Sequence, residues 1–267
     1  MRIFWSLFRQ HLRHQRFTTL IWLALIGMMA YSVASVAKSV VAGNNLENIL
    51  NSLGGLKNLF GDPSAYKHPA DLYIQGKWLF FMPLLMGIFG VLSSMGILAR
   101  EIDRRTADFV LTLPVRRSAV LLSRFAALTV NLGLLYFGSF AMIWLGLRHM
   151  HIAGSFSGYA LYSLGQYVLT LFFAALTLYL SLFVNEYPVA NRYALIGVVA
   201  FYTLNLIARS VGAPRIASEL TVFGLADAQS VIGGESFPWL AVAIGGLLTI
   251  ICLWASTRLF EQKQVPA

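Results

Sequence analysis

The chain has 267 residues, of which 58% are hydrophobic and only 12% are charged, and its mean hydropathy is +0.69. Soluble domains are about a quarter charged, so this composition excludes a water-soluble domain of the same size. The net charge of +9 does not indicate a nucleic-acid-binding protein, because the Lys and Arg residues lie in gaps between apolar runs, where they act as signals of membrane topology.

The first segment, residues 1–16, is basic and amphipathic and reads MRIFWSLFRQHLRHQR. On a helical period its apolar residues share one face and its four arginines lie mostly elsewhere, which is typical of a helix in the plane of the lipid headgroups. An ordinary basic anchor with fortuitous spacing is the alternative. The small residues at 34–37 resemble a signal-peptide cleavage site, but the apolar run before them is too long, so we expect no cleavage.

Six apolar runs follow, each near the roughly 20 residues that a bilayer-spanning helix needs. They cover residues 17–37, 78–99, 125–147, 159–184, 193–207 and 237–257. Residues 17–257 are therefore predicted to form an all-α, polytopic transmembrane domain, in which the fifth span is the shortest. Pro83 lies inside the second run and is expected to kink it, and the single cysteine, Cys252, is expected to be a small buried residue.

The segments between these runs predict the orientation of the chain. With the N-terminus inside, the inner segments 1–16, 100–124, 185–192 and 258–267 hold 13 of the 20 Lys and Arg residues. The positive-inside rule then predicts a multi-pass protein of the cell membrane with both termini in the cytoplasm. The outer loop 38–76 is expected to carry short amphipathic helices near 44–60, broken at Gly54 and Gly55, and residues 258–267 form a cytoplasmic tail.

Polar residues inside the runs are few, namely Asn131, Gln166 and Asn205, with Arg209 near an edge. The absence of a central carboxylate or lysine argues against a proton-driven pump and against a small-ion pore. His149 and His151 are expected to be interfacial, because nothing nearby supplies further metal ligands. Small residues are predicted to permit close helix packing: Gly133, Gly138, Ala174, Ala175, Gly245 and Gly246.

No catalytic signature is present in the sequence. The motifs H-E-x-x-H, G-x-S-x-G and the nucleotide-binding G-x-x-x-x-G-K-[ST] are all missing, so the chain is not expected to be an enzyme or to bind ATP or another cofactor itself.

The segment AREIDRRTADFVLTLPVRRSAVLL, residues 99–122, concentrates charge between the second and third runs. Thr106 is a helix N-cap type, and Phe109 and Leu113, four residues apart, give the following short helix an apolar edge. Pro114 ends that helix but suits the first turn of the next one. The pattern predicts a short, stiff projection that has an apolar edge flanked by arginines and that could bind in a groove on a soluble partner.

This segment resembles the loop between the second and third spans of ABC-2 type transporter permeases. The matching residues are Glu101, Thr106, Phe109, Leu111, Thr112, Pro114, Val115 and Arg117. The sequence departs from the family pattern at Arg116, where serine is usual, and at Arg105, where many members have glycine.

The resemblance implies a permease of two membrane subunits, alike or different, above two cytoplasmic ATPase subunits that bind ATP and magnesium. Thr106–Leu113 would be the coupling helix and residues 1–16 the interfacial elbow. The resemblance implies contact with the ATPase by Glu101, Arg104, Arg105, Thr106, Phe109, Leu113, Pro114, Arg116 and Arg117.

The function expected from the sequence is therefore the permease subunit of an ATP-driven exporter. Its weakly polar, aromatic-rich spans favour an amphipathic or hydrophobic substrate. Two alternatives stay open at this point. One is a membrane anchor or sensor subunit that recruits cytoplasmic partners without transport. The other is a self-contained channel or carrier, which is expected to show internal repeats.

Overall fold

The computed structural model describes residues 2–42, 68–79, 81–97, 117–183, 187–210, 231–232 and 237–262. Within these residues there is no strand, and six helices are long and apolar enough to cross a membrane. The elements are α1 (Arg2–Ala42), α3 (Pro69–Ile74), the π-helix η3 (Gln75–Leu79), α4 (Met82–Met95), α7 (Arg117–His149), α8 (Phe156–Ser181), α9 (Tyr187–Ser210) and α12 (Trp239–Gln262). The predicted all-α, six-span fold is confirmed.

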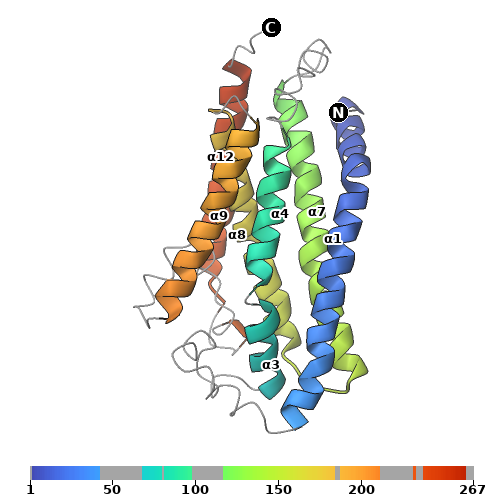
Figure 1. The fold of residues 1–267 in the computed structure, drawn as a ribbon. Coiled ribbons are helices and arrows are strands. Elements are labelled where there is room, and N and C mark those ends of the chain that lie inside the picture. The colour runs from blue at the N-terminus through green and yellow to red at the C-terminus, as the bar shows by residue number, and fades with distance from the viewer. Residues whose placement is uncertain are drawn as a thin grey trace.

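The helices form one bundle in which neighbours in space are not always neighbours in sequence (Figure 1). α1 packs along α7, α8 contacts α4, α7 and α12, and α9 packs on α4. α1 begins, and α12 ends, at the same end of the bundle (Figure 1). α4 also ends there and α7 begins there (Figure 1).

The first helix is longer than its apolar run and has no break at its start. α1 runs from Arg2 to Ala42 without interruption, so residues 2–16 continue directly into the first span, and their position in the headgroup plane stays a prediction. The physical reason is that no proline or glycine occurs before Gly27, and nothing else interrupts the hydrogen-bond ladder. At 1.5 Å per residue the helix is about 60 Å long, roughly twice the hydrocarbon thickness.

The second span begins earlier than predicted and consists of three pieces. It starts at Pro69, not at Trp78, and passes through α3 and η3 before α4 begins at Met82. Pro83 stands in the first turn of α4, where its missing N–H is tolerated, so the irregular backbone lies before it. The outer loop predicted for 38–76 is shorter at both ends as a result. The short helices predicted near 44–60 lie outside the described residues.

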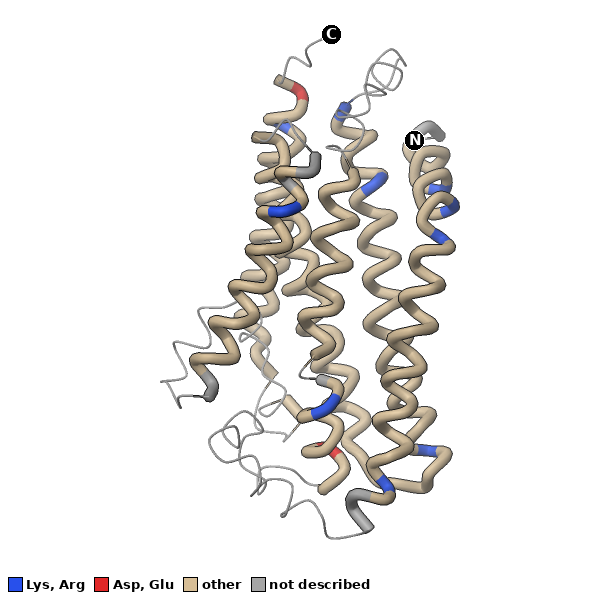
Figure 2. The backbone as a smooth tube through the Cα atoms, viewed as in Figure 1, with Lys and Arg blue, Asp and Glu red and all other residues tan. Residues whose placement is uncertain are grey.

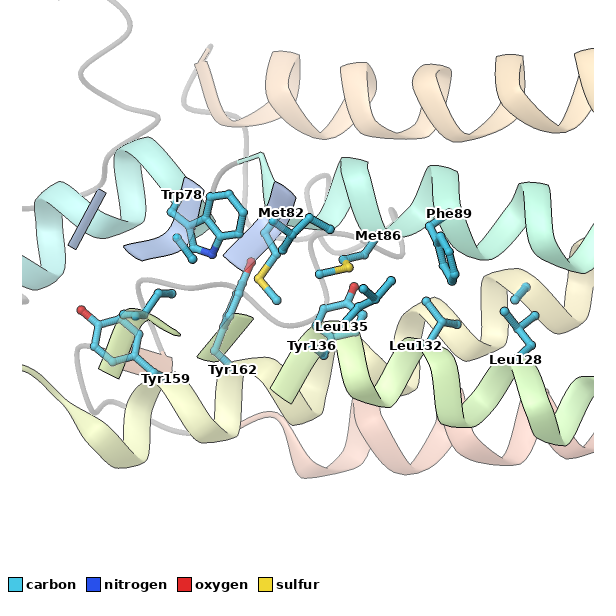
Figure 3. Packing of buried hydrophobic residues seen from close by; sticks show 14 of the residues in the cluster. Trp78, Met82, Met86, Phe89, Leu128, Leu132, Leu135, Tyr136, Tyr159 and Tyr162 are labelled. Atoms are coloured by element: carbon cyan, nitrogen blue, oxygen red, sulfur yellow. The ribbon is translucent and has the colours of Figure 1, made fainter. Parts of the chain in front are cut away.

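The centre of the bundle is filled by large side chains. Trp78, Met82, Met86 and Phe89 recur along one face of η3 and α4, where they are at most 3% exposed, and they point toward α7 (Figure 3). The α7 residues in this core are Leu128, Leu132, Leu135 and Tyr136, all fully buried. The interior of this one chain is therefore a packed core.

Small residues set the closest helix contacts, as predicted. A Cβ added to Gly138 would lie 2.5 Å from Leu23 Cδ1, and one added to Gly245 would lie 3.0 Å from Leu169 Cδ2. At Gly133 and Gly246 the nearest atoms are at 3.7 and 3.9 Å, which is ordinary contact. Ala174 and Ala175 are fully buried on α8, and Cys252 is half-buried on α12.

Three helices keep broad apolar faces outside the core. α1, α9 and α12 carry most of the exposed large apolar side chains, and Phe17, Tyr193 and Leu240 are 65%, 67% and 76% exposed. In a bilayer such faces meet lipid chains or another membrane subunit.

Candidate coupling end of the bundle

The residues predicted to contact the ATPase belong to the segment between α4 and α7. Eight of them lie outside the described residues: Glu101, Arg104, Arg105, Thr106, Phe109, Leu113, Pro114 and Arg116. Arg117 is described and is the first residue of α7. The predicted coupling helix therefore stays a prediction, but the structure fixes the two points, Ile97 and Arg117, from which its segment leaves the bundle.

Positive charge gathers at the end of the bundle that carries both termini (Figure 2). By their places in the helices, the described cations of this end are Arg9, Arg13, Arg16, Arg117, Arg124, Arg192 and Arg258, with Glu261 as the acid. The opposite end has Lys38, Lys77 and Arg148, with Asp71. This asymmetry matches the positive-inside pattern on which the predicted orientation of the chain is based.

Arg124 joins the start of the segment to α7. Its Nη1 donates a hydrogen bond of 2.7 Å to the backbone oxygen of Ile97, and the side chain is only 9% exposed. α4 ends at Met95, and the last carbonyls of a helix lack intrahelical partners and carry partial negative charge. Ile97 lies two residues beyond Met95, and the guanidinium gives its backbone oxygen a charge-assisted bond close to this negative end of α4.

Two further hydrogen bonds tie this base to neighbouring helices. Ser94 Oγ, in the last turns of α4, donates to the backbone oxygen of Ala174 on α8 at 2.6 Å. Asn131 Nδ2 on α7 donates to Gln15 Oε1 on α1 at 2.7 Å. The end of α4 is therefore joined to α7 and α8, and α7 is joined to α1 about two turns further into the bundle.

Sequence reasoning counted Arg124 only as a loop charge and missed its partner. One signal was available: Arg124 and Asn131 are seven residues apart, two turns on one helix face, within an otherwise apolar stretch. Gln15 gave no such signal, because it lies in the basic first segment where polar residues are ordinary.

The opposite end contains a buried carboxylate that sequence reasoning also missed. Asp71 is fully buried, and its Oδ1 accepts a hydrogen bond of 2.6 Å from the hydroxyl of Tyr159. It was assigned to the outer loop because the polar residues around it lowered the local hydropathy. On the same side, His149 Nδ1 shares a hydrogen bond with the Tyr31 hydroxyl, and no group of three potential metal ligands occurs within the described part of the chain.

Together the fold and this end define a class of protein: a polytopic membrane protein of six spans, with a basic face where the segment between the second and third spans emerges. A family model, ABC-2 family transporter protein, matches residues 1–223. The chain therefore belongs to the ABC-2 transporter family and is a permease subunit of an ABC transporter. No curated protein and no solved structure matches the chain.

Proposed function

We propose that this chain, paired with a second permease subunit, forms the membrane pathway of an ATP-driven exporter, and that separate cytoplasmic ATPase subunits dock on residues 98–116. The observation that supports it best is that α4 ends and α7 begins at the basic end of the bundle, where α1 begins and α12 ends (Figure 1). The ATP and magnesium belong to the ATPase, since the sequence of this chain has no phosphate-binding motif of its own.

The contacts at the base describe how force would pass into the membrane. A displacement of the segment by the ATPase would move Ile97 and, through the hydrogen bond of Ile97 to Arg124, the first turns of α7. The Asn131–Gln15 bond then links α7 to α1. A partner shifts a conformational equilibrium only through contacts that differ between the two states, and this base provides a physical connection between the docking segment and two of the six spans.

The packed interior favours a pathway between two subunits over one within a single chain. The face formed by Trp78, Met82 and Met86 is fully buried against α7 (Figure 3), so opening this bundle from within would separate its core. The exposed apolar faces of α1, α9 and α12 are the surfaces left for a second subunit. Their apolar, aromatic character supports an amphipathic or hydrophobic substrate.

The test replaces the predicted apolar edge and measures binding and coupling separately. Phe109→Ala and Leu113→Ala are expected to reduce co-purification of the ATPase and substrate-dependent ATP hydrolysis at least tenfold, as buried interface anchors do. The matched control is Phe183→Ala, an exposed phenylalanine (61%) that follows α8 at the same end of the bundle. Unchanged binding and hydrolysis in both edge variants would contradict the proposal.

The same experiment distinguishes the anchor or sensor alternative. A subunit that only recruits partners loses co-purification in these variants, but its wild-type form neither stimulates ATP hydrolysis nor moves substrate across reconstituted vesicles.

A further inference from the structure

The carboxyl group of Asp71 has only one of its two oxygens hydrogen-bonded. Oδ1 accepts the Tyr159 hydroxyl at 2.6 Å and lies 3.4 Å from the backbone nitrogen of Ser155. Oδ2 is buried and has no hydrogen-bond partner among the described residues. Asp71 forms no ion pair within the described residues. A carboxylate enclosed in this way is costly, because burial removes water from the charge and no ion pair within the described residues replaces that water.

A second oxygen without a partner among the described residues lies four residues further on, at Gln75, the first residue of η3. Gln75 is 4% exposed, and its Oε1 is also buried without a hydrogen-bond partner. Side chains four residues apart on a helix lie on the same face and are within reach of each other. Each of these two buried acceptors needs a donor, since an oxygen left without one loses the hydrogen bond it made to water.

We propose that Asp71 binds a proton in the folded protein and that its Oδ2–H donates a hydrogen bond to Gln75 Oε1. One proton then satisfies both oxygens and removes the buried charge, while Oδ1 continues to accept from Tyr159. The neutral acid thereby fastens the start of the second span to Ser155 and Tyr159 at the start of α8. This site is separate from the coupling end and does not depend on the proposed function.

The titratable groups around this site form no ion pair with Asp71 within the described residues, although His68 interacts favourably with the charge of its carboxylate. His68 precedes α3 and is half-buried. The nearest titratable group on α8 is the Tyr159 hydroxyl, which already donates to Oδ1. α1, which packs on α3, brings Lys38, which is exposed, and Tyr31, whose hydroxyl is bonded to His149 of α7.

The sign of the pH dependence follows from this arrangement. The folded chain holds a proton that the unfolded chain releases to water near neutral pH, so the contribution of the site to stability is present at low pH and falls as the pH rises. At high pH the proton leaves, a bare carboxylate is buried, and the contact between α3 and α8 weakens. Asp71→Asn removes this dependence, because its amide donates to Gln75 and its oxygen accepts from Tyr159.

The experiment uses infrared spectroscopy and thermal unfolding of the purified full-length chain in detergent. At neutral pH the wild type is expected to show the carbonyl stretch of a protonated carboxylic acid. This band should shift in Gln75→Leu and be absent in Asp71→Asn. It should remain in Glu261→Gln, the control variant of an exposed acid. Asp71→Asn should melt at the wild-type temperature and lose the decline at high pH, whereas Asp71→Leu should melt lower by about 5 °C, because it leaves Tyr159 and Gln75 unsatisfied.

Three results would overturn the proposal, and the first needs no variant to fold. The first is a carboxylic acid band that is absent from the folded wild type at neutral pH, or that does not change as the pH of the folded protein is raised. The band persists in Asp71→Asn. Melting temperature rises with sodium or another cation and not with acidity, which would assign the two oxygens to a metal ion. The state of the ATPase contact affects none of these readouts, so failure here is distinguishable from failure of the transporter proposal.

Discussion

The guanidinium of Arg124 hydrogen-bonds the backbone oxygen of Ile97 at 2.7 Å, across the base of the segment that joins the second and third spans. A buried arginine near a membrane is costly unless its donors are satisfied. Here the accepting oxygen lies just beyond α4, the helix that precedes the predicted coupling helix in the chain. The contact is therefore expected to stabilise the bundle and also to pass movement of the docking segment on to α7.

Arg124→Gln is expected to lower the free energy of unfolding by about 1.5–3 kcal/mol, because it replaces a bond to a charged donor and leaves the Ile97 oxygen buried without its partner. ATPase co-purification should persist while substrate-stimulated hydrolysis falls, since the docking surface stays and its base loosens. The control is Arg148→Gln, at the opposite end, where the guanidinium lies 5.3 Å from the Trp144 ring. Equal melting temperature and coupling in both variants would contradict this role.

The orientation of the bundle is tested by two positions on a single helix. In a Cys252→Ser background, Gln10→Cys and Ser39→Cys place one exposed thiol near each end of α1. A membrane-impermeant maleimide should label the Ser39→Cys variant in intact cells and the Gln10→Cys variant only after permeabilisation, because the arginine-rich end is retained in the cytoplasm. The reverse pattern would place the coupling segment outside and contradict the docking proposal.

Hydropathy was sufficient to predict the six spans, because each apolar run overlaps one of the six long apolar segments of the structure and mainly the ends differ. The second span shows where this reasoning stops. Asp71 and Gln75 make its first turns look like a loop, and only the three-dimensional contact with Tyr159 shows that these polar groups are buried. Arg124 shows the same limit, since its partner is a backbone oxygen, which carries no signature in the sequence.

The Asn131–Gln15 hydrogen bond joins α7 to α1, and its contribution is measurable by a double-mutant cycle. Asn131→Leu, Gln15→Leu and the double variant should give a coupling energy of about 0.6 kcal/mol and at most ~1.7 kcal/mol, the range of hydrogen bonds between membrane helices. Unfolding of the purified chain in detergent measures it. A coupling energy of zero would mean that the two side chains do not stabilise each other, and α1 would then follow α7 through apolar packing alone.

Two glycines, one at a tight contact between α1 and α7 and one with open space around it, are expected to respond in opposite ways to substitution by alanine. A Cβ at Gly146 would lie 2.6 Å from Ala34 Cβ and 3.3 Å from the backbone oxygen of Tyr31, atoms that no rotamer change can move away. Gly146→Ala should therefore force the helices apart and cost about 1–3 kcal/mol. Gly197 on α9 is the matched control, because a Cβ there meets nothing within 4 Å.

Gly197→Ala should leave stability unchanged or raise it by about 0.5–1 kcal/mol, since alanine loses less backbone entropy in a helix. Thermal unfolding of both variants beside the wild type separates them, with each kcal/mol shifting the melting temperature by about 2–4 °C for a chain near this size. If Gly146→Ala melts with the wild type, then α1 and α7 do not meet at Ala34 and Gly146. The packing that aligns Gln15 with Asn131 would then be wrong as well.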